Sequence, residues 1–111
     1  GKNPRQAAAL ARDLRSVTRA GAFACILEYI HASVAANLTR KSAIPTIGIG
    51  AGPGCDGQVL VLQDMLGLNE GFRPRFLQTW AELATVVRRA ADTYATDVRE
   101  GRYPGREHSF E

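Results

Sequence analysis

The chain has 111 residues, of which 45% are hydrophobic and 23% charged, a composition that excludes global disorder and allows one domain at most. Its net charge of +3 is mild, and no recognition motif accompanies it, so we expect no nucleic-acid partner. We also expect no membrane partner, because neither a membrane span nor a signal peptide is visible. A reducing cytoplasm is therefore the default location.

The first predicted elements are a helix and a strand. Asn3 and Pro4 indicate a helix start, because asparagine caps helix N-termini and proline suits the first helical position. Apolar residues then recur every three or four positions as one buried face, which ends at Gly21. A continuous apolar run over residues 22–27 predicts a buried parallel strand that ends at Glu28. The residues of the buried helix face are Ala7, Leu10, Ala11, Leu14 and Val17.

The middle of the chain continues this alternation of helix and strand. A second, weaker helix is predicted over residues 32–40, and a second strand over 44–49. Residues 50–57 form a glycine-rich loop. A third apolar run, residues 58–62, predicts a third strand.

The last part of the chain contains an irregular stretch, a long helix and a tail. Residues 67–73 are expected to be irregular, and the helix is expected to run from 74 or 76 to 99. The helix could cover this chain's own sheet or dock on another subunit, and its pattern does not discriminate between these. Residues 101–105 are turn-forming. The apolar stripe of the helix is Phe76, Trp80, Leu83, Val87, Ala90, Tyr94 and Val98.

This order of elements predicts an α/β fold. Helices that alternate with strands imply a parallel sheet with right-handed crossovers. One βαβ unit takes about 30 residues, whereas a closed (β/α)8 barrel takes about 250. The chain is therefore either a small open sheet or part of a larger barrel.

Glu28 is the first candidate for chemistry. It stands at the carboxyl end of a predicted parallel strand, the edge where active sites of such folds lie. A carboxylate at the end of an apolar strand is partly desolvated, which suits a general base. A structural role, capping the next helix or pairing with an arginine, is equally compatible with this position. His31 could be a partner of Glu28, but the start of the next helix is the favoured interpretation.

The second candidate is the glycine-rich run 48–54. Its glycines would let the backbone approach a ligand and offer N–H groups to an anion. Both nucleotide fingerprints fail, however, because Pro53 stands where each requires glycine. A sterically crowded barrel rim is favoured over an anion site. Asp56 and Asp64 are expected to be structural, and His108 is expected to lie at the surface or an interface.

Several blocks of the sequence resemble one family. Residues 20–28, 44–52, 56–61, 64–67 and 103–110 occur in the order found in ketopantoate hydroxymethyltransferase, also called 3-methyl-2-oxobutanoate hydroxymethyltransferase. The blocks cover nearly the whole chain. The resemblance implies that 1–111 is a single segment of a (β/α)8 TIM barrel of the phosphoenolpyruvate/pyruvate type. It would supply the last three strands and the C-terminal helix, and the N-terminal half would be absent.

The resemblance also implies an activity. The family transfers a hydroxymethyl group from 5,10-methylenetetrahydrofolate to 3-methyl-2-oxobutanoate, giving 2-dehydropantoate in pantothenate biosynthesis. Glu28 would be the general base, and Mg²⁺ would chelate the keto acid. Family members are cytoplasmic homo-oligomers, often decamers. One departure is His31, where the family commonly has proline.

The family's metal ligands are not among these residues. Its two aspartates, and the lysine and histidine of its site, lie on earlier strands, and neither Asp56 nor Asp64 matches them. A general base contributes about 10²–10⁴-fold and the metal several kcal/mol. We therefore expect the isolated chain to be inactive. The alternatives are a truncated, non-catalytic interaction module that docks through the C-terminal helix, and an anion-binding module that uses the glycine-rich run.

Overall fold

The computed structural model describes residues 1–71 and 74–110. The end of the predicted irregular stretch 67–73 therefore lies outside the described residues. The chain divides into two compact units, Gly1–Leu60 and the residues from Val61 onward, and each is described by itself.

The first unit begins with helix α1, Pro4–Arg19. Its start is the predicted one, since the side chain of Asn3 accepts a hydrogen bond of 2.9 Å from the N–H of Gln6. The helix ends before Gly21, whose φ of +94° lies in the left-handed region that favours glycine. Both terminal signals in the sequence are thus confirmed.

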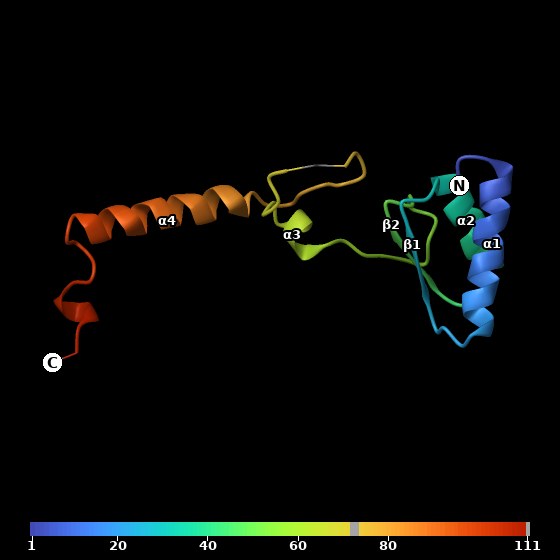
Figure 1. Ribbon diagram of the computed structural model, residues 1–111, viewed down its shortest axis with the longest axis horizontal. Helices are drawn as coiled ribbons and strands as arrows, with labels where there is room; N and C mark the ends of the chain where they lie inside the picture. Colours follow the sequence, from blue (N-terminus) through green and yellow to red (C-terminus); the bar gives the residue numbers. More distant parts are fainter. Residues whose placement is uncertain (72–73, 111) are drawn as a thin grey trace. The chain divides into compact units, whose positions relative to one another are not determined.

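A sheet of three parallel strands follows in the order β1-β2-β3. Helix α2, Ala32–Lys41, connects the first two strands. The two helices lie together on one side of the sheet (Figure 1). The predicted parallel α/β arrangement is confirmed. The strands are β1 Cys25–Glu28, β2 Thr46–Ile49 and β3 Gly57–Gln58.

The third strand is much shorter than the predicted 58–62. Only Gly57–Gln58 is strand, and one further backbone bond joins the N–H of Val59 to the carbonyl oxygen of Gly48 at 3.0 Å. The ladder stops there because β2 itself ends at Ile49, and Gly50 leaves the sheet with a φ of +61°. An apolar run cannot continue as a strand without a partner backbone.

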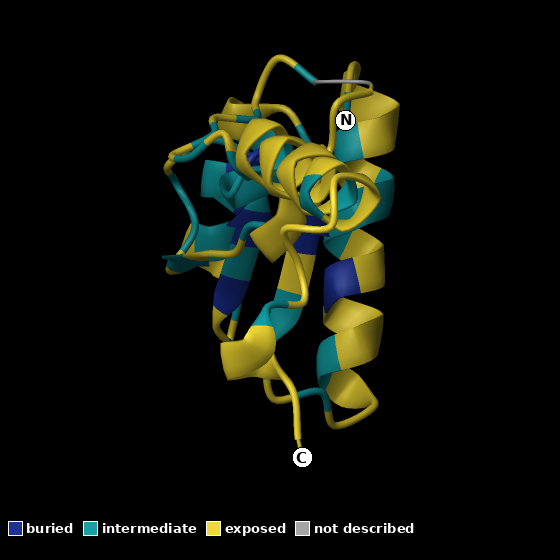
Figure 2. Cartoon of the chain, turned by 90° about the vertical axis from the view of Figure 1, so that its left-hand side faces the viewer, coloured by how far each residue is buried: buried dark blue, intermediate teal, exposed yellow. Residues whose placement is uncertain are grey.

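The core of the first unit is small and lies between the sheet and the two helices. In β1, Leu27 is 5% exposed and faces the helices, whereas Ile26 is 63% exposed on the opposite face. Successive side chains of a strand point to opposite faces, so only one face of β1 is covered. Figure 2 colours the buried residues dark blue. The buried apolar residues are Leu14, Leu27, Ala35, Leu38 and Ala51.

The second unit contains helix α3, Leu62–Met65, helix α4, Leu83–Arg99, and a short 3-10 turn, Arg106–His108. The prediction that the long helix starts at residue 74 or 76 is wrong. The N–H of Trp80 donates to the carbonyl oxygen of Met65 at 2.8 Å, and the N–H of Leu83 donates to that of Leu66 at 3.0 Å. Because these N–H groups are bonded to the end of α3, the segment just before Leu83 does not continue α4 toward the N-terminus.

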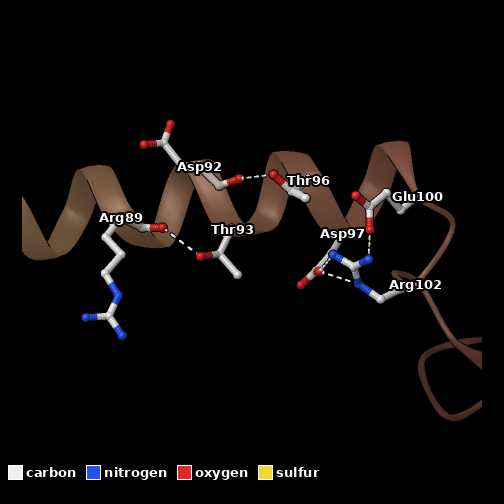
Figure 3. Close-up of polar contacts among 7 residues, drawn as sticks. All are labelled: Arg89, Asp92, Thr93, Thr96, Asp97, Glu100 and Arg102. Carbon is white, nitrogen blue, oxygen red and sulfur yellow. Dashed lines mark hydrogen bonds and ion pairs between the residues drawn. The ribbon is translucent and has the colours of Figure 1, made fainter.

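Helix α4 presents much of its predicted stripe to solvent. Val87 and Tyr94 are 58% and 60% exposed. At the C-terminal end, two nitrogens of Arg102 donate to the Asp97 carboxylate at 2.8 Å, and Arg102 also pairs with Glu100 (Figure 3). Within the described ranges, no helix combines the length and apolar character that a membrane crossing requires.

Candidate functional site

Glu28 is the last residue of β1 and lies opposite Ile49 of β2. It is exposed, on the sheet face that the helices do not cover. The partial desolvation expected from the apolar strand is therefore not provided by this unit, because the strand buries only its other face. The carboxylate is open to a ligand that approaches this edge of the sheet.

The structural alternatives for Glu28 find no support among the described residues. Helix α2 starts at Ala32 with His31 as its N-cap residue, and this cap has no side-chain hydrogen bond. The ion pairs formed by residues 1–71 and 74–110 do not include Glu28. The carbonyl oxygen of His31 instead accepts 2.9 Å bonds from Val34 and Ala35, which confirms His31 as the start of the helix.

The residue after Glu28 has an unusual backbone conformation that the sequence did not indicate. Tyr29 has a φ of +52°, and its N–H donates to the carbonyl oxygen of Ile49 at 2.9 Å. A residue other than glycine in this region costs about 1–3 kcal/mol and persists only where its surroundings hold it. Tyrosine carries no sequence signal for a left-handed turn, since glycine and asparagine are the usual residues there.

The glycine-rich run packs against helix α2. A Cβ added at Gly52, where φ is +74°, would collide with Ala32. A Cβ added at Gly54 would lie 2.5 Å from the Cβ of Ala36. Close packing therefore requires glycine at these two positions, which agrees with the crowding that was expected of the run.

Gln58 links β3 to this run, a contact that sequence reasoning missed. Its side-chain amide donates a 3.0 Å hydrogen bond to the carbonyl oxygen of Gly52. Gln58 also stands opposite Gly48 in the parallel register. The only signal in the sequence was its position directly after Asp56-Gly57, which by itself does not specify a partner.

Asp56 has the structural role that was expected. Its carboxylate accepts bonds from the backbone N–H of Thr46 at 2.8 Å and from the Thr46 hydroxyl at 3.1 Å. Thr46 is fully buried and its hydroxyl lies 2.8 Å from that of Thr39 on α2. Asp56 thereby fixes the start of β2 and not its carboxyl end.

The remaining polar candidates belong to the second unit. Asp64 lies in the first turn of α3, and its carboxylate accepts from the Asn69 side chain at 2.5 Å. His108 is exposed; its Nδ1 accepts from the N–H of Gly105 at 3.1 Å, and its ring packs against Tyr103. Neither residue joins Glu28 in one compact unit.

The described residues do not suit a magnesium ion. Over residues 1–71 and 74–110, no three histidine, cysteine, aspartate or glutamate side chains gather where they could hold a metal. Asp56 and Asp64, the aspartates nearest the strand ends in sequence, have protein partners instead.

Known proteins resemble the chain over nearly its whole length. A family model described as ketopantoate hydroxymethyltransferase matches residues 1–106. Two relatives named 3-methyl-2-oxobutanoate hydroxymethyltransferase come from Syntrophotalea carbinolica and Geotalea daltonii. They are 52% and 51% identical over 110 residues, which cover 99% of this chain. A third relative of that name, from Trichlorobacter lovleyi, is 50% identical over 95% of the chain.

The chain spans about 41% of the length of the first two relatives and 40% of the third. The match includes the Glu28 strand, the glycine-rich run and α4. The identity is near 50% over almost the whole chain, and the family model covers all but the last five residues. The chain belongs to the ketopantoate hydroxymethyltransferase family.

Proposed function

We propose that this chain supplies the general base, Glu28, of a 3-methyl-2-oxobutanoate hydroxymethyltransferase. The single observation that carries the proposal is the exposed carboxylate at the carboxyl end of a parallel strand, in a chain of this family. In parallel α/β folds, that edge carries the catalytic residues. The absence of a described ion pair leaves the carboxylate available to accept a proton.

In the proposed reaction, the Glu28 carboxylate takes the proton from C-3 of 3-methyl-2-oxobutanoate. The resulting enolate carbon forms a bond to the methylene carbon of 5,10-methylenetetrahydrofolate. As the bonds from that carbon to the two folate nitrogens break, water supplies the hydroxyl group. One nitrogen takes up the proton held by Glu28, and the other takes up the second proton of the water. The products are 2-dehydropantoate and tetrahydrofolate.

The sheet has the features of one part of a (β/α)8 barrel, and we propose that 1–111 forms the last three strands and the C-terminal helix of such a barrel. Its strands are parallel and adjacent in sequence order, and α1 and α2 lie together on one face. The other face carries the exposed Ile26 and Glu28, as the interior of a barrel would.

Other parts of the proposal rest on the family resemblance. They are a cytoplasmic location, a homo-oligomeric assembly and a Mg²⁺ ion held by residues outside this chain. A general base by itself contributes about 10²–10⁴-fold to the rate. The isolated chain would have this base but would lack the residues that hold the metal. We therefore propose that the 111 residues are inactive alone.

The test is a Glu28→Gln substitution in the full-length protein. Glutamine keeps the shape of the side chain but cannot accept the proton. The assay uses NMR to measure the rate at which the C-3 proton of 3-methyl-2-oxobutanoate exchanges in D₂O, with folate left out. This rate should fall by about 10²–10⁴-fold in Glu28→Gln. Glu70→Gln, at an exposed carboxylate that pairs with Arg88, is the matched control and should leave exchange unchanged. Exchange retained by Glu28→Gln would refute the assigned role.

A second candidate is a non-catalytic module that docks through α4. The observation in its favour is the exposed apolar stripe, in which Val87 and Tyr94 are more than half exposed. Light scattering of the isolated chain tests this candidate. A stable monomer at all concentrations would contradict it, whereas association that Val87→Asp abolishes would support it.

A further inference from the structure

We propose that Gln58 is a positioning residue for Glu28 and acts through the glycine-rich loop 50–54. The inference rests on the proposed role of Glu28 as general base. The side chain of Gln58 joins β3 to this loop. Its amide donates to the carbonyl oxygen of Gly52 at 3.0 Å, while β3 itself spans only two residues.

The first step of the connection runs from Gln58 to helix α2. Gly52 lies against Ala32, so closely that an added Cβ would collide with the alanine. Ala32 is the first residue of α2. The hydrogen bond from Gln58 therefore holds the loop against the start of the helix that follows Glu28.

The second step runs from α2 and β2 back to Glu28. Only residues 29–31 separate Glu28 from Ala32, so the packing of Gly52 fixes one end of this short turn. The other end is fixed by the 2.9 Å bond from the Tyr29 N–H to Ile49, the residue just before the loop. One end of the turn after Glu28 thus depends on the loop, and the other end depends on β2, the strand from which the loop leaves.

The turn needs such support because Tyr29 holds a left-handed φ of +52°. A strained residue relaxes when the packing around it loosens. Relaxation of Tyr29 would move the carboxylate that immediately precedes it. A general base must lie within hydrogen-bond reach of the proton it takes, and a misplacement of about 1 Å can lower the rate by roughly 10²-fold.

The side chain of Gln58 contacts protein backbone, so its loss should affect the position of the base more than the binding of the keto acid. Gln58→Met keeps the length of the side chain and removes the donor. Gln58→His restores a donor at a ring nitrogen. In the full-length protein, we expect Gln58→Met to lower kcat by about tenfold with KM changed less than about twofold, and Gln58→His to recover most of kcat.

A second readout does not depend on activity. Amide hydrogen exchange at Tyr29 reports how often its bond to Ile49 opens, and it should become about tenfold faster in Gln58→Met. The control is Gln63→Met, at another exposed glutamine, in α3. It should change neither kcat nor exchange at Tyr29.

The outcomes separate this inference from the proposed function. If Glu28→Gln loses C-3 proton exchange while Gln58→Met keeps kcat and Tyr29 protection, Gln58 does not position the base and the role of Glu28 stands. If Glu28→Gln keeps proton exchange, the proposed role of Glu28 as general base is wrong, and Gln58 has no base to position. A loss of kcat in Gln58→Met that Gln58→His does not recover would overturn the hydrogen bond as the cause.

Discussion

Gly54 offers a clean steric test of how the glycine-rich loop sits on helix α2. An added Cβ would lie 2.5 Å from the Cβ of Ala36 and 3.0 Å from its Cα. Unlike Gly52, Gly54 is not among the residues with positive φ, so an alanine there meets a collision without backbone strain. Gly54→Ala should therefore destabilise the protein through this one contact.

The magnitude follows from opposing contributions. Overpacking at a rigid contact costs about 1–3 kcal/mol, while replacing glycine with alanine restricts the unfolded chain and returns about 0.4–1 kcal/mol. We expect Gly54→Ala to lower the free energy of unfolding by about 1–2 kcal/mol. Ala36→Gly alone should cost about 1 kcal/mol, because glycine in a helix interior is unfavourable.

The assay is a double-mutant cycle measured by urea denaturation of the full-length protein, with circular dichroism as the signal. In the double variant, the Cβ of residue 36 is gone and the 2.5 Å collision disappears, while the 3.0 Å approach to its Cα remains. This residual crowding offsets the stability that the restricted unfolded chain returns. The double variant should therefore be about as stable as Ala36→Gly alone, which corresponds to a coupling energy of about 1–2 kcal/mol. Gly52→Ala paired with Ala32→Gly is the contrast, since the strained φ of +74° would remain.

Strict additivity of Gly54→Ala and Ala36→Gly would refute the reasoning. It would mean that the two residues do not touch, and that the loop takes another path over α2. The proposed link from Gln58 through the loop to α2 would then be wrong as well, because it requires the same loop to rest on the same helix.

Three further substitutions test other contacts by the same denaturation assay. Asp56→Ala should cost about 1–3 kcal/mol because it leaves the N–H of the buried Thr46 without its acceptor; a cost below that of an ordinary surface change would count against the contact. Tyr29→Val should be about 1–2 kcal/mol less stable than Tyr29→Asn, since asparagine tolerates a left-handed φ, and equal stability would contradict the strained turn. Asn3→Ala should cost about 1 kcal/mol through the lost cap on Gln6, and no change would show that the cap contributes nothing.

Elements with strong local signals were predicted well. The cap at Asn3 and the glycine at 21 delimit α1 because both act on the backbone next to them. The apolar runs before Glu28 and Gly50 form β1 and β2, although each strand is shorter at its start than its run. Apolar residues outside a strand can pack without joining the ladder, so the run alone does not set the boundary.

Elements that depend on distant partners were predicted poorly. The third strand stops after Gln58 because β2 offers no further backbone, and α4 starts at Leu83 because bonds to the end of α3 hold the preceding segment. An amphipathic stripe that includes Phe76 and Trp80 does not reveal those bonds. Here tertiary contacts outweigh helical periodicity.

The sequence by itself determined the family, the parallel α/β order and the placement of Glu28 at a strand end, since each of these depends on motifs and local patterns. The tertiary structure alone decided how the site is supported. It placed Gly52 on Ala32, joined Gln58 to the Gly52 carbonyl and put Tyr29 in a left-handed turn. These features arise where segments far apart in the chain meet, and packing between such segments leaves no periodic or local trace in the sequence.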